Sequence, residues 1–140
     1  MAEMHGMRPG ATATDMDHAA IAERYLRAIG DRDFDTVLGI FAEDVVGEWP
    51  QSGERFRGKQ ACLNVYANYP GGSPKVLGTP TIKASGDLVV SQAEMEYPDG
   101  KRWLAVSILE FRDGKIAHET DYFAERFPAP EWRMQWVDRD

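Results

Sequence analysis

The strongest constraint on the fold is a change in the spacing of apolar residues after position 74. From Lys75 to Phe123 apolar and polar residues alternate, which is the period of a β-strand, and three turns divide this region: Ser85–Asp87, Pro98–Lys101 and Arg112–Lys115. Asp-Gly pairs in such turns are typical of hairpins, because glycine accepts the positive φ that a tight turn requires. The pattern predicts four antiparallel strands in a meander.

The first part of the chain has the spacing of amphipathic helices. Thr14, with Asp17 three residues later, has the pattern of a helix start, and apolar residues then recur every three or four positions. Asp33 is placed to cap a second helix with its own apolar stripe. We therefore predict helices over about residues 15–29 and 34–41.

A short strand and a third helix follow these two helices. Val45–Trp49 has the composition of a strand, and a turn then leads through Glu54–Arg57. The third helix begins near Lys59 and carries apolar residues up to Tyr69. The Pro/Gly cluster Pro70–Pro74 ends it, because proline cannot continue a helix.

The length of 140 residues is sufficient for one domain with a substantial core. Residues 1–14 have no apolar segment typical of a secretion signal, so we expect a disordered tail there and a single domain over 15–140 in a cytoplasmic protein. No apolar run approaches the roughly 20 residues needed to span a bilayer.

A short terminal helix is predicted from Pro130, with Trp132 and Trp136 one turn apart.

Charge and motif content exclude several classes of protein. The formal net charge of -7 opposes binding to nucleic acid or to an anionic membrane. No glycine-rich phosphate-binding motif is present, so we expect no nucleotide cofactor. The histidines His5, His18 and His118 are scattered, and Cys62 is the only cysteine. We therefore expect no intrachain disulfide and no metal site, although these counts argue only against a zinc site and leave a carboxylate-rich site open.

The strand predicted over Arg102–Arg112 is apolar on both faces. Trp103 and Leu109 are among the apolar residues of one face, and Leu104 and Ile108 are among those of the other. A strand that is apolar on both sides requires cover on both sides. Since the helices cover only one face of a small curved sheet, we predict a homodimer in which a second subunit covers the other.

The last strand of the meander carries the candidate chemistry. Alternation places Glu119, Asp121 and Phe123 on one face, and Ile116, His118 and Tyr122 on the other. If the first face is buried, its two carboxyls must be hydrogen-bonded, protonated or placed in a polar cavity. A raised pKa in one carboxyl would then favour acid/base chemistry at Asp121. The alternatives are solvated carboxylates at the mouth of the sheet, or a register shifted by one that turns His118 inward.

The order of elements, three helices and then a meander, predicts an α+β fold in which helices close one side of a curved sheet. With several short motifs, this order resembles the SnoaL-like proteins of the nuclear transport factor two-like superfamily, over roughly residues 15–130. The motifs are Arg24-Tyr25-Leu26, Phe41-Ala42-Glu43-Asp44, Glu48-Trp49-Pro50, Arg57-Gly58 and Asp113-Gly114-Lys115-Ile116. The resemblance implies a conical, cystatin-like α+β barrel with a pocket between the helices and the concave sheet, usually in a homodimer. It leaves the function open, because this fold hosts enzymes and non-enzymes.

Three enzyme groups of the superfamily imply different site residues. In steroid isomerases a tyrosine of the first helix and an acid bind an oxyanion; Tyr25 matches the tyrosine, but Trp49 stands at the base position and Ser107 at the second acid position. In limonene-epoxide-hydrolase-like enzymes a strand Arg-x-Asp pair orients water; Asp121 matches the Asp, and Glu119 replaces the Arg. In SnoaL-like polyketide cyclases an Asp of the last strand is the acid/base; Asp121 matches it, and Ser107 replaces a His.

Our leading hypothesis from the sequence is a SnoaL-like enzyme that performs acid/base chemistry without a cofactor on a small hydrophobic molecule. Asp121 would be the catalytic residue, and six further residues would bind the ligand: Tyr25, Trp49, Trp103, Ser107, Glu119 and Phe123. The activity would be of the polyketide-cyclase-like lyase or isomerase type, or like that of an epoxide hydrolase. The alternative is a dimeric domain of the same fold that binds a ligand or serves a structural role without catalysis.

Overall fold

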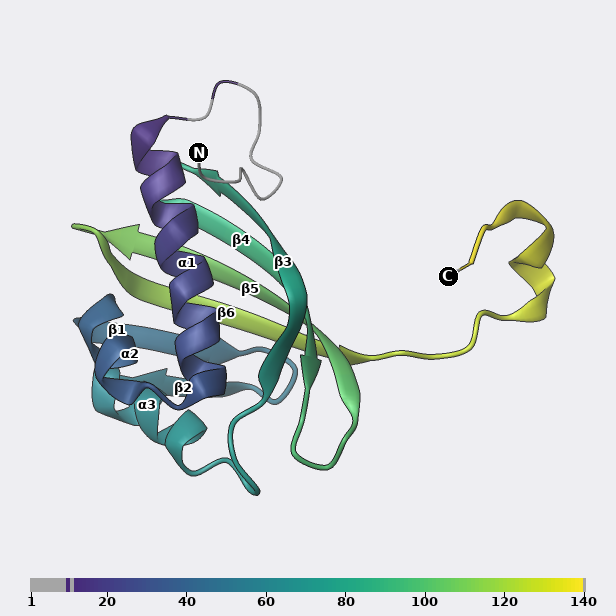
Figure 1. The fold of residues 1–140 in the computed structure, drawn as a ribbon, viewed down its shortest axis with the longest axis horizontal. Coiled ribbons are helices and arrows are strands. Elements are labelled where there is room, and N and C mark those ends of the chain that lie inside the picture. Colours follow the sequence, from purple (N-terminus) through teal and green to yellow (C-terminus); the bar gives the residue numbers. More distant parts are fainter. Residues whose placement is uncertain (1–9, 11, 140) are drawn as a thin grey trace.

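The computed structural model describes residue 10 and residues 12–139, and these form one curved sheet with helices on its concave face (Figure 1). The elements in chain order are α1 (Ala13–Asp31), α2 (Phe34–Ile40), β1 (Phe41–Trp49), β2 (Glu54–Arg57), α3 (Lys59–Ala67), β3 (Lys75–Ser85), β4 (Leu88–Glu96), β5 (Arg102–Arg112), β6 (Lys115–Glu125) and a 3-10 helix (Glu131–Trp136). The predicted α+β class is confirmed. Within the described residues, no helix is long and apolar enough to cross a membrane.

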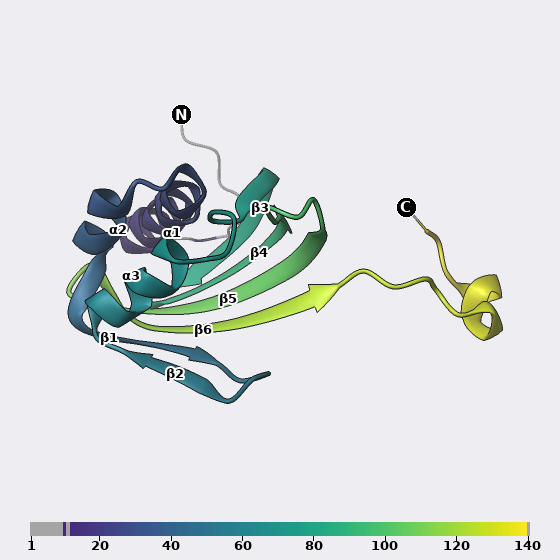
Figure 2. The ribbon, with the colours of Figure 1, turned by 90° about the horizontal axis from the view of Figure 1, so that it is seen from below.

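The sheet has the strand order β2-β1-β6-β5-β4-β3. Strands β3 to β6 form the predicted antiparallel meander. The sheet is curved but unclosed, and Figure 2 shows the three helices lying across its open, concave side. One pair differs from the expected antiparallel sheet, because β1 runs parallel to β6. Parallel neighbours require a long connection, and the chain between β1 and β6 supplies it.

Helix α1 begins two residues earlier than predicted, and its cap differs from the predicted pair. The side chain of Thr12 accepts a hydrogen bond from the Asp15 backbone, and Asp15 accepts one from the Thr12 backbone in return. Thr14 and Asp17 have the same spacing, but both lie inside the helix. The expected tail over residues 1–14 falls largely outside the described residues, apart from the start of α1.

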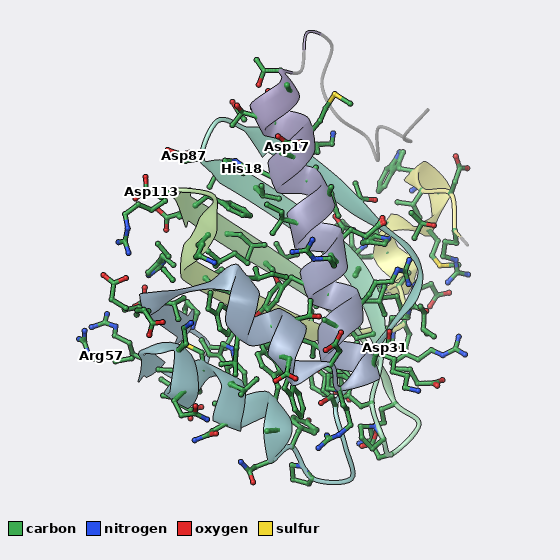
Figure 3. All side chains as sticks on the ribbon, turned by 60° about the vertical axis from the view of Figure 1, so that its left-hand side comes forward. Asp17, His18, Asp31, Arg57, Asp87 and Asp113 are labelled. Carbon is green, nitrogen blue, oxygen red and sulfur yellow. The ribbon has the colours of Figure 1, made fainter. Side chains whose placement is uncertain are left out.

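Asp15 and His18 fasten the start of α1 to the turn between β3 and β4. The Gly86 backbone N–H donates to Asp15 Oδ1 at 2.6 Å, and His18 Nδ1 donates to the Gly86 carbonyl at 2.7 Å. The His18 ring stacks on Phe111, with centroids 4.2 Å apart. Figure 3 shows His18 on the side of α1 that faces the turn carrying Asp87. These contacts fix the helix across the concave face of the sheet.

The start of β1 is four residues earlier than predicted. Helix α2 ends at Ile40, and Phe41 already belongs to the strand, where it pairs with Ile116 of β6. Phe41 lies four residues after Val37, which is helical spacing, so its position in the sequence predicted that Phe41 belongs to the second helix. The pairing with β6 overrides this local pattern and buries the Phe41 ring completely.

A β-bulge in β6 overturns one predicted face. Phe111 of β5 pairs with Ile116, whereas its neighbour Glu110 pairs with His118, so Ala117 is an extra residue in β6. Ile116 was predicted to share a face with His118, but it is fully buried in the core cluster with Phe111. Strict alternation failed here because the extra residue shifts the side-chain phase by one.

The convex face of the sheet retains exposed apolar side chains. Val90, Leu88 and Tyr122 are 37%, 44% and 42% exposed on β4 and β6. The chain then leaves the sheet, and Figures 1 and 2 show its last part extending away from the domain. The predicted terminal helix is present as a 3-10 helix, and its residues Trp132 and Trp136 are 72% and 71% exposed.

Candidate active site

The two carboxyls of β6 lie at the centre of the concave face. Strand β6 is flanked by β1 and β5, so that Gly47 and Leu109 lie beside Glu119, and Ser107 lies beside Asp121. Beyond the bulge the expected alternation holds, and both carboxyl side chains point to the same side as the helices. Glu119 is 5% exposed and Asp121 is 3% exposed. Two acidic side chains are therefore held together in the interior.

Burial is the main cause of the unusual acidity of this pair. It raises the pKa of Glu119 well above its ordinary value, and the negative charge of Asp121 raises it further. Burial also raises the pKa of Asp121, but hydrogen-bonding groups of Glu119, Ser107 and Trp49 oppose this effect. The donors around Asp121 favour its ionised form. These directions favour Glu119 over Asp121 as the member of the pair that retains a proton.

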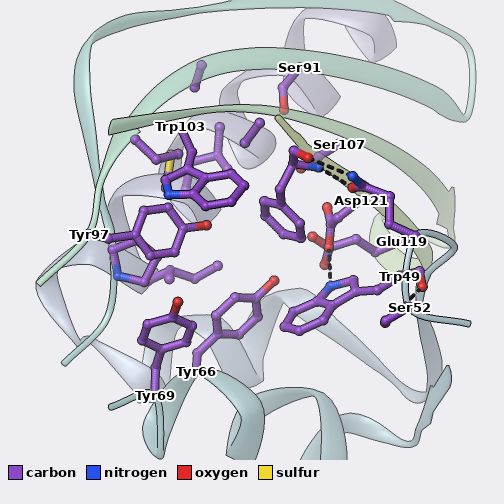
Figure 4. Close-up of a pocket in the computed structure, with 18 of the residues that line it drawn as sticks. Trp49, Ser52, Tyr66, Tyr69, Ser91, Tyr97, Trp103, Ser107, Glu119 and Asp121 are labelled. Atoms are coloured by element: carbon purple, nitrogen blue, oxygen red, sulfur yellow. Dashed lines mark hydrogen bonds between the residues drawn. The ribbon is translucent and has the colours of Figure 1, made fainter. Parts of the chain in front are cut away.

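The two oxygens of Asp121 have different surroundings. Trp49 donates a hydrogen bond from Nε1 to Asp121 Oδ2 at 3.2 Å, as Figure 4 shows. Asp121 Oδ1 is buried, and no donor among the described residues meets it in good hydrogen-bond geometry, although Glu119, Ser107 and Tyr66 lie close to this carboxyl group. A buried carboxylate oxygen without a partner carries a free-energy penalty that a ligand group or a water molecule would remove.

Tyr25 and Tyr66 form the layer between the carboxyl pair and the helices. The Tyr25 hydroxyl donates to Glu119 Oε1 at 2.5 Å, and the ring is fully buried. The Tyr66 hydroxyl lies near the Tyr25 hydroxyl and the Asp121 carboxyl group, and its pKa is raised well above the ordinary value, mainly by burial. Both phenols therefore remain protonated donors at neutral pH.

A cavity of about 400 Å³ lies between the helices and the concave sheet, and Asp121 and Glu119 line it. Its walls are mainly apolar and aromatic. The Trp49 ring packs edge-on against Phe56 and Phe123, with centroids 4.9 and 5.4 Å away. This size and composition are typical of a small-molecule site in which a few polar groups orient an apolar ligand.

Six of the seven residues that the sequence proposed for the site line this cavity: Trp49, Trp103, Ser107, Glu119, Asp121 and Phe123. The seventh, Tyr25, lies behind Glu119, which it holds by its hydroxyl. The sequence analysis missed Tyr66, because it falls on the apolar stripe of α3 and has the pattern of a core residue. Within the described part of the chain, no group of three His, Cys, Asp or Glu side chains is placed to hold a metal ion.

Comparisons with known proteins agree with this fold. A family model described as a SnoaL-like domain matches residues 22–119. An NTF-2 like protein of unknown function from Burkholderia xenovorans LB400 is 31% identical, with a TM-score of 0.80 over 92% of this chain and 99% of that one. A candidate ketosteroid isomerase from Kribbella flavida is 27% identical, with a TM-score of 0.79 over 93% and 94%.

An M. tuberculosis epoxide hydrolase described as LEH-like is 25% identical, with a TM-score of 0.64 over 78% of this chain and 84% of that one. No curated protein matches the sequence significantly. The family match begins halfway along α1 and ends at Glu119, halfway along β6, so it spans most of the domain. The chain therefore belongs to the SnoaL-like family and has the nuclear transport factor two-like fold.

Proposed function

We propose that this protein is an enzyme that moves a proton within a small hydrophobic substrate, without a cofactor. The observation that carries the proposal is the carboxyl group of Asp121, which is 3% exposed and lines a mainly apolar cavity. A carboxylate in such a place is a stronger base than one in water, because burial disfavours its charge. The similar ketosteroid isomerase candidate and epoxide hydrolase support an enzyme of this size and fold.

The residues divide into distinct roles. The Asp121 carboxylate would take a proton from a carbon next to a carbonyl, and the electron pair would move onto the carbonyl oxygen. The hydroxyls of Ser107 and Tyr66 line the same cavity and would donate to that oxygen. The proton then returns to another atom of the substrate, so the reaction is an isomerisation or a ring closure. Glu119, held by Tyr25, would remain neutral and limit the negative charge at the site.

A test that needs no knowledge of the natural substrate is the elimination reaction of a nitrobenzisoxazole. In this planar probe a base removes a proton from carbon, the N–O bond breaks, and a coloured phenolate forms. We expect turnover above the rate of free acetate, and a loss of about 100-fold or more in Asp121→Asn. Asp113→Asn, in the turn between β5 and β6, is the control with the same charge change. Equal turnover in wild type and Asp121→Asn would refute the assignment of Asp121 as the catalytic base.

The second candidate is a domain of this family that binds an apolar ligand without converting it. It is favoured by the aromatic walls, which Trp49 and Trp103 provide, and by Glu119, which stands where related hydrolases would have an arginine. The same probe separates the two candidates. Binding of the probe, seen as quenching of tryptophan fluorescence, without any elimination in wild type would favour the binding protein.

We further propose that a second copy of the chain covers the convex face, giving a homodimer. Leu88, Val90 and Tyr122 leave an exposed apolar band there, which a soluble monomer seldom retains. Analytical ultracentrifugation should show a dimer for the wild type and a monomer for Val90→Arg. A wild-type monomer at all concentrations would contradict this assembly.

A further inference from the structure

The end of the cavity away from the carboxyl pair is walled by three aromatic rings, Tyr69, Tyr97 and Trp103, which we call the aromatic rim. The centroids of Tyr69 and Tyr97 are 5.5 Å apart, and those of Tyr97 and Trp103 are 6.1 Å apart. Both pairs are tilted by 57°, so the rings are adjacent walls of one recess rather than a stack. Figure 4 shows them grouped opposite Trp49 and Asp121.

The loops that carry the aromatic rim are tightly packed together. Gly71 has φ +81°, and a Cβ atom there would lie 2.8 Å from Pro98 Cβ, so the two loops are in close contact. In the hairpin turn, Tyr97 N donates to the Lys101 carbonyl at 2.9 Å, and Lys101 N donates to Asp99 Oδ1 at 2.9 Å. The positions of Tyr69 and Tyr97 are therefore set before any ligand binds.

One carboxylate lies near the aromatic rim, and others line the rest of the cavity. Asp99 and Glu54 line the same cavity, and the ionised Asp121 lies at its far end. The pKa of Tyr69 is raised by burial and by the charge of Asp99, which places this carboxylate near the ring. Lys101, in the same turn as Asp99, is the one cation among the described residues that line the cavity, against these three carboxyl groups. The recess is therefore aromatic and has the Asp99 carboxylate beside Tyr69, and negative charges outnumber positive ones over the cavity as a whole.

We propose that the aromatic rim binds a cationic group, a protonated or quaternary amine, on an apolar substrate whose other end reaches Asp121. Aromatic faces attract cations through their quadrupole, and the attraction is largest where water is partly excluded. Tilted aromatic walls beside a carboxylate are the arrangement that selects an ammonium group over an uncharged group of the same shape. Only the chemistry at Asp121 rests on the proposed function; the binding of the cation does not.

The test uses three probes of nearly the same shape. Phenyltrimethylammonium, its neutral isostere tert-butylbenzene, and benzenesulfonate are titrated into the full chain, and binding is followed by tryptophan fluorescence. We expect the cation to bind about tenfold more tightly than the neutral isostere, and the sulfonate to bind most weakly. If the walls were merely apolar, tert-butylbenzene would bind as well as the cation or better. If Lys101 set the selectivity, the sulfonate would bind most tightly. Either result would overturn the proposal.

Variants locate the binding within the cavity. Trp103→Leu retains apolar volume but removes an aromatic face, so it should weaken the cation about tenfold and leave the neutral isostere within a factor of about three. Asp99→Asn should weaken only the cation, and Asp87→Asn, in the turn between β3 and β4, should change neither. Equal losses for both probes would indicate apolar packing alone. If the protein binds the cation selectively but does not convert the nitrobenzisoxazole, the cation site is supported and the proposed enzyme activity is refuted.

Discussion

Replacing Glu119 with glutamine should make the stability of the protein less sensitive to pH. Glutamine has the shape of a protonated glutamate, so its amide oxygen still accepts from Tyr25 and its NH₂ group still donates to Asp121. In wild type, burial raises the pKa of Glu119 well above its ordinary value. The folded protein therefore retains a proton that the unfolded chain releases above about pH 4.3.

The sign of the effect follows from this difference in proton binding. A group whose pKa is raised in the folded state stabilises the protein most below its unfolded pKa, and that stabilisation is lost as pH rises towards its folded pKa. While Glu119 remains protonated, each pH unit lowers the free energy of unfolding by about 1.4 kcal/mol. Over the pH range in which folded Glu119 remains protonated, wild type should thus lose stability at this rate, whereas Glu119→Gln should not.

Urea unfolding, followed by tryptophan fluorescence at several pH values and one protein concentration, measures this difference. Glu131→Gln, in the exposed 3-10 helix, removes one carboxyl without touching the site and should follow the wild-type pH dependence. Parallel curves for wild type and Glu119→Gln would mean that Glu119 is ionised in the folded protein. That result would refute the assignment of the proton.

Three further substitutions test separate contacts. Trp49→Phe removes the donor to Asp121 Oδ2, which favours the ionised carboxylate, so the acid limb of the elimination rate should move to higher pH; an unchanged limb would contradict this role. Asp15→Ala leaves two backbone N–H groups without their acceptor and should lower the free energy of unfolding by about 2 kcal/mol in urea. Gly71→Ala places a Cβ atom against Pro98 at a positive φ and should cost about 2 kcal/mol; a cost near zero would show that the two loops separate easily.

Local patterns predicted the parts of the fold that depend on neighbours in the sequence. The Asp-Gly turns and the alternation after Lys75 predicted the meander correctly, and the apolar stripes predicted the three helices. The boundaries at Phe41 and Ala13 were wrong, because strand pairing and a different capping pair decided them. The bulge at Ala117 has no local signal, since the extra residue is defined only by its pairing with β5.

The part of the candidate site that could be predicted is the pair of ionisable residues that share one face of a strand. Two carboxyls with the same phase on one strand, Glu119 and Asp121, mark a buried acidic pair whenever that face of the sheet is covered. The role of Tyr66 was not predictable, because a tyrosine on an apolar helical stripe has the same pattern whether its hydroxyl is used or not. Likewise, the bond from Trp49 to Asp121 joins residues 72 positions apart and depends on the parallel pairing of β1 with β6.

The central claim is that the pair holds one proton on Glu119 and leaves Asp121 ionised. Infrared spectroscopy near neutral pH measures this directly, because a protonated carboxylic acid has a carbonyl stretch distinct from that of a carboxylate. We predict one such band in the wild type that persists in Asp121→Asn and disappears in Glu119→Gln. A wild-type spectrum without the band, or a band lost in Asp121→Asn and retained in Glu119→Gln, would contradict it.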